Sequence, residues 1–194
     1  QRILEFKWVY AMEKIHGTSA HVAWKDGQLR FFAGGSKHES FEALFDQDNL
    51  KQVLQEIGHP TVTVYGEAYG GKMMGMGKVY GPTMRFVAFE VLVDKSWLNV
   101  EQAQDVAYKL DLDFVAWERC STDIDLLTRV REAPSPQAQK LGMGEHPKEG
   151  IVLRPPFEVT LNDGERLIAK FKTTAYQERV KEPKVGEDLV VLEG

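Results

Sequence analysis

A lysine and a glycine lie close together in the segment Glu13-Lys14-Ile15-His16-Gly17, just ahead of a predicted strand. A lysine amine is a nucleophile only when neutral, and a reference pKa of about 10.4 leaves under roughly 0.1% of it neutral at pH 7. Burial or nearby positive charge increases the neutral fraction and permits covalent catalysis. Gly17 would allow the backbone to approach a nucleotide closely. Taken alone, the segment is more typical of a solvated lysine before a turn.

Two carboxylates lie at the ends of predicted strands. Glu67 follows the predicted strand 61–65, and Glu149 leads directly into the predicted strand 150–154. A carboxylate in such a position can accept a hydrogen bond from a ribose hydroxyl or hold a metal-bound water. Each of them alone is more typical of a solvated strand end, so neither identifies a site by itself.

The predicted strand 84–94 carries a ring that could stack on a base. Strict alternation along this strand places Phe89 and Val91 on one face and Glu90 on the other. Aromatic faces bind purines without reading sequence, so Phe89 is a candidate for stacking and Phe86 is an alternative. Without further context, a phenylalanine in such a strand is more typical of a core.

Two lysines lie two residues apart in Lys170-Phe171-Lys172, within the predicted strand 167–172. The period of two residues in a strand places both ammonium groups on one face. There they can bind a polyphosphate together. By itself the pattern is more typical of a solvated sheet face.

The elements that would position these residues follow from turn signals and from the spacing of apolar residues. Asp26-Gly27 between two β-favouring runs predicts a hairpin. Strands and helices are interspersed without the regular rhythm of a parallel sheet, so the sequence predicts an α+β fold of mainly antiparallel sheets flanked by helices. The predicted strands are 19–24, 29–33, 61–65, 84–94, 150–154 and 167–172, and the predicted helices are 41–57, 99–110 with Asn99 as cap, and 122–131.

The composition bounds the class of protein. The chain has 194 residues, 43% hydrophobic and 27% charged, which suits one folded domain over residues 1–194 and excludes disorder. The net charge of −5 argues against a protein that binds nucleic acid through an overall positive charge. Any phosphate must therefore bind at a local group of basic residues. No apolar run approaches the roughly 20 residues of a membrane-spanning helix. The single cysteine, Cys120, fits a reducing compartment, and we expect a cytoplasmic monomer with no membrane partner.

Taken together and in this order, five stretches resemble the motifs of the covalent nucleotidyltransferase superfamily of ATP-dependent ligases and RNA capping enzymes. They are Lys14-Ile15-His16-Gly17, Tyr65-Gly66-Glu67, Phe86-Val87-Ala88-Phe89-Glu90, Glu149-Gly150-Ile151-Val152 and Lys170-Phe171-Lys172. The histidine in the first stretch resembles RNA ligases of the nick-sealing phage and kinetoplastid editing type, because DNA ligases usually carry aspartate there. The resemblance extends over residues 13–172.

The resemblance implies the fold of the catalytic domain of ATP-dependent ligases and an RNA ligase that acts in RNA repair with ATP and Mg²⁺ or Mn²⁺. It implies that Lys14 takes AMP from ATP and that AMP then passes to a 5′-phosphate of RNA, at a free end or in a nicked duplex. A 3′-hydroxyl would finally displace AMP and join the ends. The partners expected from the resemblance are therefore ATP and RNA.

The resemblance also implies roles by matched position. Phe89 and Val152 would pack on the two faces of adenine, and Glu67 would contact the ribose. Glu149 would help hold the metal. Besides Lys14, the implied catalytic residues are Lys170 and Lys172, which would contact the α-phosphate, and the further nucleotide-binding candidates are Glu13, Ile15, Gly17 and Lys37.

The chain departs from the pattern of these relatives at two positions. Ser19 stands where they often have asparagine, and Lys37 is the basic residue nearest to the place of an arginine. Lysine cannot copy the bidentate geometry of a guanidinium. Only residues 173–194 follow the last motif, so we expect no OB-fold or C-terminal domain, and a capping enzyme is disfavoured. The alternatives are a nucleotidyltransferase with another acceptor, such as DNA ends or capped RNA, and a non-catalytic nucleotide-binding relative.

Overall fold

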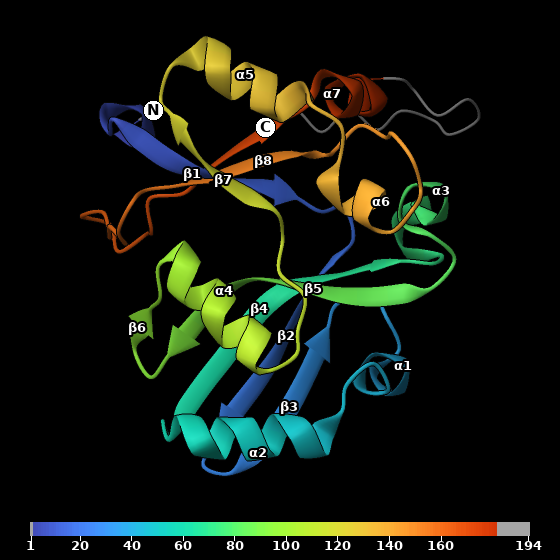
Figure 1. Ribbon diagram of the computed structural model, residues 1–194, viewed down its shortest axis with the longest axis vertical. Helices are drawn as coiled ribbons and strands as arrows, with labels where there is room; N and C mark the ends of the chain where they lie inside the picture. Colours follow the sequence, from blue (N-terminus) through green and yellow to red (C-terminus); the bar gives the residue numbers. More distant parts are fainter. Residues whose placement is uncertain (1, 182–194) are drawn as a thin grey trace.

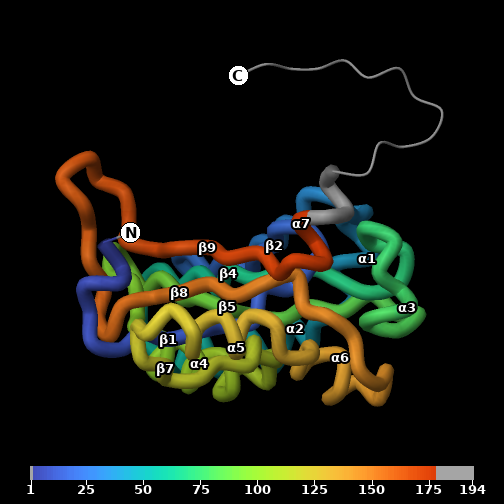
Figure 2. Tube along the Cα trace, turned by 90° about the horizontal axis from the view of Figure 1, so that it is seen from above, coloured from blue at the N-terminus to red at the C-terminus, as the bar shows by residue number. Residues whose placement is uncertain are grey.

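The computed structural model describes residues 2–181, which form two antiparallel sheets with flanking helices (Figure 1). One sheet has the strand order β7-β1-β8-β9 and the other has the order β3-β2-β4-β5-β6. Helices α4 and α5 lie on the same side of the molecule, away from β9 (Figure 2). The predicted α+β fold of mainly antiparallel sheets is confirmed. Within residues 2–181, no helix is long and apolar enough to cross a membrane.

The elements have the following bounds. The strands are β1 Trp8–Lys14, β2 Thr18–Lys25, β3 Gln28–Ala33, β4 Thr61–Gly70, β5 Met84–Val93, β6 Ser96–Trp97, β7 Trp117–Ser121, β8 Gly150–Arg154 and β9 Ala169–Lys172. The α-helices are α1 His38–Glu42, α2 Gln47–Ile57, α3 Gly77–Tyr80, α4 Val100–Lys109, α5 Ile124–Glu132, α6 Pro136–Lys140 and α7 Thr174–Lys181. Two short 3₁₀ helices are η1 Arg2–Glu5 and η2 Met73–Gly75.

Local signals account for the hairpin and for α4. Asp26 and Gly27 have φ values of 49° and 81°, which is the conformation that a two-residue turn between β2 and β3 requires. The Asn99 side chain accepts a hydrogen bond from the Gln102 amide at 2.8 Å, and the Gln102 side chain accepts one from the Asn99 amide at 3.2 Å. This capping box starts α4 at the predicted position.

The predicted single helix over residues 41–57 is wrong, because the structure has two helices there. α1 ends at Glu42 and α2 begins at Gln47. Asp46 has an extended backbone and accepts a hydrogen bond from the Asn49 amide at 3.1 Å, so it caps α2. Apolar residues on both sides of the break pack into the same core, which explains why their spacing resembles that of one helix.

The sequence patterns do not predict β1, the strand that ends at Lys14. Tyr10 and Met12 belong to the larger apolar core, whereas Val9 and Ala11 belong to a smaller core on the other face of the sheet. A strand that is buried on both faces lacks the alternation of apolar and polar residues that identifies a half-buried strand. β1 pairs with both β7 and β8, so the end of this strand is held from two sides.

A bulge interrupts the pairing of β4 with β5. Tyr65 pairs with Glu90 and Gly66 pairs with Ala88, which leaves Phe89 as an extra residue. A bulge re-aims the side chains next to it. The strict alternation predicted for β5 is therefore wrong at this point, and Phe89 and Glu90 line the same cavity.

Candidate active site

Two adjoining cavities lie between the sheets. Cavity 1 has a volume of about 220 Å³ and is lined from both sheets, by Met12 and Val152 on one side and Phe89 on the other. Cavity 2 has a volume of about 400 Å³. Lys14 and Glu67 line both cavities, so the two spaces meet at these side chains.

Lys14 is placed at this junction because it is the last residue of β1. Its Nζ atom lies 2.9 Å from Oε2 of Glu149, and the two side chains are 23% and 8% exposed. The register aligns Lys14 with Gly150 and Gly150 with Lys172, so three neighbouring strands bring their polar residues to one edge. A Cβ atom at Gly150 would lie 2.1 Å from the carbonyl oxygen of Phe171, which is why this position has no side chain.

Glu67 is the second carboxylate at the junction. Burial raises its pKa to about 7, and the charge of Glu149 adds to this rise. The charge of Lys14 and a hydrogen bond from the Gly17 amide act in the opposite direction. Lys14 thus forms an ion pair with Glu149 and acts on Glu67 through its charge alone, as Lys170 does, which is an arrangement with room for a further positive charge.

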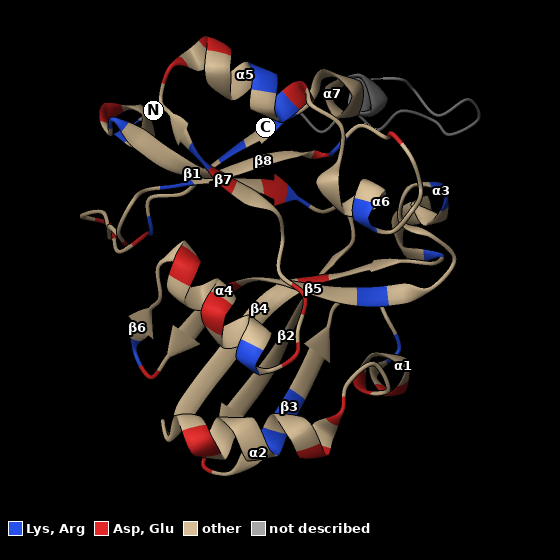
Figure 3. Ribbon diagram, viewed as in Figure 1, with Lys and Arg blue, Asp and Glu red and all other residues tan. Residues whose placement is uncertain are grey.

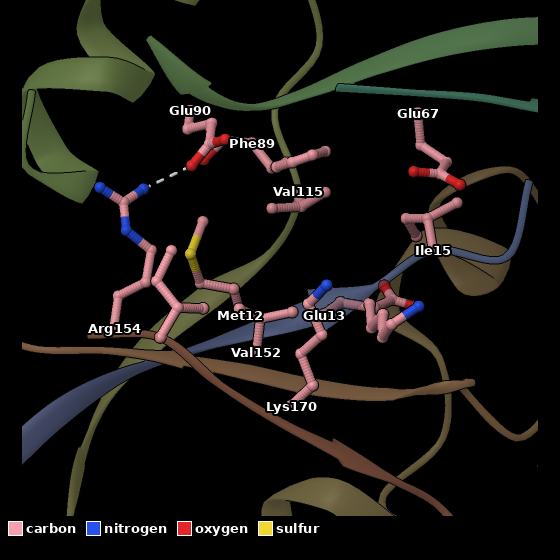
Figure 4. Close-up of a pocket in the computed structure, with 12 residues that line it drawn as sticks. Met12, Glu13, Ile15, Glu67, Phe89, Glu90, Val115, Val152, Arg154 and Lys170 are labelled. Atoms are coloured by element: carbon pink, nitrogen blue, oxygen red, sulfur yellow. Dashed lines mark hydrogen bonds between the residues drawn. The ribbon is translucent and has the colours of Figure 1, made fainter. Parts of the chain in front are cut away.

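Cavity 1 has apolar walls and a basic edge (Figure 4). Phe89 and Val152 line it from β5 and β8, Ile15 lines it from the link after β1, and Lys170 lies at its edge. Phe86 is buried instead, with its ring 5.8 Å from that of Phe41. The bulge in β5 therefore makes Phe89, and not Phe86, the ring of the cavity.

Glu13 also lines cavity 1, but its carboxylate is bound within the protein. It accepts hydrogen bonds from the Ser135 hydroxyl at 2.5 Å and from the Gln137 amide at 2.9 Å. Burial raises the pKa of this carboxyl, although these two hydrogen bonds oppose the rise. The Glu13 side chain therefore anchors the end of β1 to α6.

The other predicted site residues divide between the cavities. Lys172 and Gly17 line cavity 2 together with Tyr176. Lys37 precedes α1 with an exposed side chain and lines neither cavity. The structure thus brings together all of the predicted site residues except Lys37.

Arg154 is a residue of cavity 1 that the sequence patterns do not identify. Its side chain is 3% exposed and donates hydrogen bonds to Glu158 Oε1 at 2.5 Å, to the carbonyl oxygen of Leu98 at 2.9 Å and to that of Phe89 at 3.3 Å. Figure 4 shows its guanidinium directed toward Phe89. The sequence does carry one sign of this role: Arg154 is a charged residue at the end of an apolar strand. A charge buried in such a place requires a hydrogen-bonding partner.

The donor atoms at the junction suit a hard cation. Glu149 and Glu67 supply carboxylate oxygens, which Mg²⁺ and Mn²⁺ prefer, and such ions take further oxygens from substrate phosphates and water. Within residues 2–181 there is no group of three or more His, Cys, Asp or Glu side chains that would hold a metal ion. The site therefore fits a cation that arrives with a phosphate ligand.

Two antiparallel sheets with a lysine–carboxylate pair in the cleft between them define a nucleotidyltransferase domain of the ligase type. The sequence matches the family model for RNA ligase over residues 7–172, and the chain belongs to the RNA ligase family. The resemblance stated above is confirmed. No curated protein gives a significant match.

Solved structures of Naegleria gruberi RNA ligase have the same fold. A mutant with ATP and Mn is 17% identical with a TM-score of 0.69, and the match covers 93% of this chain and 54% of that one. The ligase with PPi and a mutant with AMP and Mn are each 16% identical with TM-scores of 0.69. This chain spans about half the length of those proteins.

Proposed function

We propose that the chain catalyses ATP-dependent RNA ligation through a covalent AMP on Lys14. The observation that carries the proposal is the position of Lys14 Nζ, 2.9 Å from Glu149 and at the meeting point of two cavities. Cavity 1 offers apolar walls for a nucleoside, and cavity 2 offers Lys172 for leaving phosphates. A nucleophile between these spaces faces the α-phosphorus of a bound nucleoside triphosphate.

In the first step, the neutral amine of Lys14 attacks the α-phosphorus of ATP. The new Nζ–P bond replaces the bond from phosphorus to the bridging oxygen, and pyrophosphate leaves with that bonding pair. The ammonium must lose one proton before the attack, and the positive charges of Lys170, Lys172 and a cation held by Glu149 would favour the neutral amine. Lys170 and Lys172 offset the negative charge that develops on the α-phosphate and on pyrophosphate.

In the second step, an oxygen of an RNA 5′-phosphate attacks the same phosphorus and the Nζ–P bond breaks. In the third step, a 3′-hydroxyl attacks the activated 5′-phosphate and AMP leaves, so one phosphodiester forms for each ATP used. Mg²⁺ or Mn²⁺ at Glu149 would supply positive charge beside the amine and the phosphates. The protein itself orients the nucleoside and keeps Lys14 at the phosphorus.

The walls of cavity 1 support the nucleoside roles that the resemblance implies. Phe89 and Val152 would hold adenine between them, with Ile15 and Glu13 along its edge. Glu67 would contact a ribose hydroxyl at the junction. We propose no contact with ATP for Lys37, because this lysine lines neither cavity.

The membership in the RNA ligase family favours RNA over DNA or capped RNA as the acceptor. We propose that the protein acts as a monomer in the cytoplasm. The one cysteine, Cys120, is buried and free, which suits a reducing compartment. Gel filtration with light scattering checks the oligomeric state.

The test is covalent labelling with radioactive ATP and magnesium. We expect AMP on Lys14, bound as a phosphoramidate that acid releases and mild alkali does not. Lys14→Arg keeps the positive charge but supplies no neutral amine, so it should abolish labelling and ATP-dependent sealing. Lys109→Arg, on the exposed side of α4, is the matched control and should label as the wild type does.

Three results would contradict the proposal. They are AMP mapped to a residue other than Lys14, labelling that survives in Lys14→Arg, and labelling from GTP but not from ATP. Sealing of RNA that carries a preformed 5′-adenylate should survive in Lys14→Arg, because the third step needs no lysyl-AMP. Sealing assays on nicked RNA, nicked DNA, hybrids and single strands then identify the acceptor.

A further inference from the structure

Four aromatic side chains form a continuous row across the five-stranded sheet. The rings of Phe32 and His21 stack at 5.1 Å with an interplanar angle of 22°. The rings of His21 and Tyr65 lie 5.4 Å apart, as do those of Tyr65 and Trp97. The guanidinium of Arg166 lies 3.7 Å from the centre of the Trp97 ring and ends the row. We call these four rings the aromatic row.

The strand register places the aromatic row on the face of the sheet that leads to the active site. His21 pairs with Phe32 on one side and with Tyr65 on the other, so the three side chains share a face. Ser19, two residues along β2, pairs with Glu67, which lines both cavities. The row is thus two residues along β2 and β4 from the position of Glu67 in the catalytic cleft.

The other face of the sheet is occupied. Val22 and Phe31, which alternate with the residues of the row, are buried against the apolar residues of α1 and α2. Figure 1 shows α2 and α4 in front of the strands. A ligand of this sheet therefore has access from the face that carries the aromatic row.

Phe32 is 49% exposed, which is a high fraction for a phenylalanine on an edge strand. Two exposed cations follow it on the same face. Arg30 pairs with Ala23, and Lys25 lies two residues further along β2. Figure 3 shows the basic residue of β3 as an isolated positive charge on that strand. An exposed ring beside cations on an open surface matches a polyanion that carries flat bases.

We propose that the aromatic row binds unpaired nucleotides of an RNA strand whose end lies at Lys14. A base would stack on the exposed ring of Phe32, which His21 backs, and phosphates would contact Arg30 and Lys25. Burial lowers the pKa of His21, so the neutral ring, which supports Phe32 and brings no charge to the row, is favoured at pH 7. This inference rests on the proposed function and names single-stranded RNA next to the reactive end as the substrate class.

The geometry favours a single strand over a duplex. In a duplex the bases stack on each other and present sugars and phosphates to a flat protein surface. The ring of Phe32 would then lose water without gaining a stacking partner. Unpaired bases gain that partner, and aromatic stacking tolerates any sequence. The two cations at the row favour RNA over an apolar protein surface as the occupant.

The test measures RNA affinity of the full chain without ATP, so that its outcome is independent of adenylation. The probes are a fluorescent 5′-phosphorylated, 3′-blocked single-stranded RNA of twelve nucleotides and the same strand in a blunt duplex. Phe32→Ala should weaken binding of the single strand by about tenfold, as the loss of one base stack predicts, and leave the duplex unchanged. Arg30→Ala should lower the salt slope of log K for the single strand by about 0.7.

Two controls match these variants. Phe157→Ala removes a ring that is 61% exposed and packs on Phe6 outside the row, and it should leave RNA affinity unchanged. Lys51→Ala removes an exposed cation of α2 and should leave the salt slope unchanged. If Phe32→Ala fails to fold, as judged by thermal unfolding, Phe32→Leu replaces it, because leucine keeps apolar packing and lacks the flat ring.

Three results would overturn this inference. They are a folded Phe32 variant that binds the single strand as tightly as the wild type, equal losses for single strand and duplex, and a wild type that prefers the duplex. Failure of AMP labelling would overturn the proposed function instead. The two experiments therefore separate the RNA surface from the adenylation chemistry.

Discussion

A Cβ atom at Gly17 would lie 2.0 Å from the carbonyl oxygen of Ala68. Gly17 is thus packed directly on the backbone of β4, immediately before β2 begins and three residues after the nucleophile. The Ala68 oxygen belongs to a strand that pairs on both sides, so it cannot move away without disturbing the sheet. The glycine of the lysine motif is required here by packing within the protein.

Gly17→Ala should lower the free energy of unfolding by about 1–3 kcal/mol, because the methyl group must displace backbone atoms. Urea denaturation followed by circular dichroism measures this change. Ser19→Ala, at an exposed position of β2, is the control and should change stability by no more than about 0.5 kcal/mol. Equal stability of Gly17→Ala and the wild type would contradict the close packing.

Phe89→Ala should raise the ATP concentration needed for half-maximal AMP labelling by about tenfold and lower the maximal rate much less. The physical reason is the loss of a stacking surface worth about 1–3 kcal/mol. Phe86→Leu should instead lower stability and keep the ATP dependence, because Phe86 packs in the core against Phe41. The opposite pattern would show that Phe86 is the stacking ring.

Glu67→Gln should make folding stability less dependent on pH. The folded-state pKa of about 7 lies above the unfolded value of 4.5, so the folded protein binds more protons in this interval. Glu67 therefore lowers the stability progressively as the pH rises from 4.5 to 7, and the full loss persists above pH 7. The glutamine variant should gain stability relative to the wild type at pH 8 and gain little at pH 5.

Urea denaturation of both proteins between pH 4.5 and pH 8 measures this difference. Glu118→Gln, at an exposed position of β7, is the control and should not produce a gain that grows with pH. A constant difference between Glu67→Gln and the wild type at all pH values would show that burial of Glu67 does not shift its titration.

Arg154→Leu should lower the free energy of unfolding by about 3 kcal/mol, since it leaves a partly buried carboxylate and two carbonyl oxygens with fewer donors. The carboxylate is that of Glu158, which keeps Arg166 as its remaining partner. Lys109→Ala removes an exposed ion pair on α4 and should have little effect. Thermal unfolding of the two variants compares them, and equal melting temperatures would contradict a structural role of Arg154.

The sequence predicted those features that depend on near neighbours along the chain. The Asp26-Gly27 turn, the Asn99 cap and the period of Lys170 and Lys172 are all properties of a few consecutive residues. The motif residues are predictable for the same reason, because each motif is a short run of consecutive residues: Lys14 ends β1, whereas Glu67 and Phe89 lie inside β4 and β5. Their meeting in one cleft is an outcome of the sheet register.

Features that depend on a distant partner were not predictable. The bulge at Phe89 exists only in the pairing of β5 with β4. The role of Arg154 depends on the carbonyl oxygens of Phe89, in the other sheet, and of Leu98, directly after β6. The break before α2 was predictable in part. Asp46 is a residue type that caps helices, but the apolar spacing continues across it and favoured one long helix.

The chain passes between the two sheets at residues 15–17 and again at residues 111–116, and both crossings lie beside Glu13. The amide of Glu13 donates to the carbonyl oxygen of Ala116 at 2.9 Å, and that of Val115 donates to Ala88 at 3.0 Å. At the other end of cavity 1, side-chain contacts join the sheets, such as the 3.3 Å hydrogen bond from Arg154 of β8 to the carbonyl oxygen of Phe89 in β5 (Figure 4). A rotation of one sheet against the other would therefore have its axis near Lys14. It would widen cavity 1 at the end away from Lys14, around Phe89 and Arg154, while the nucleophile stays almost in place.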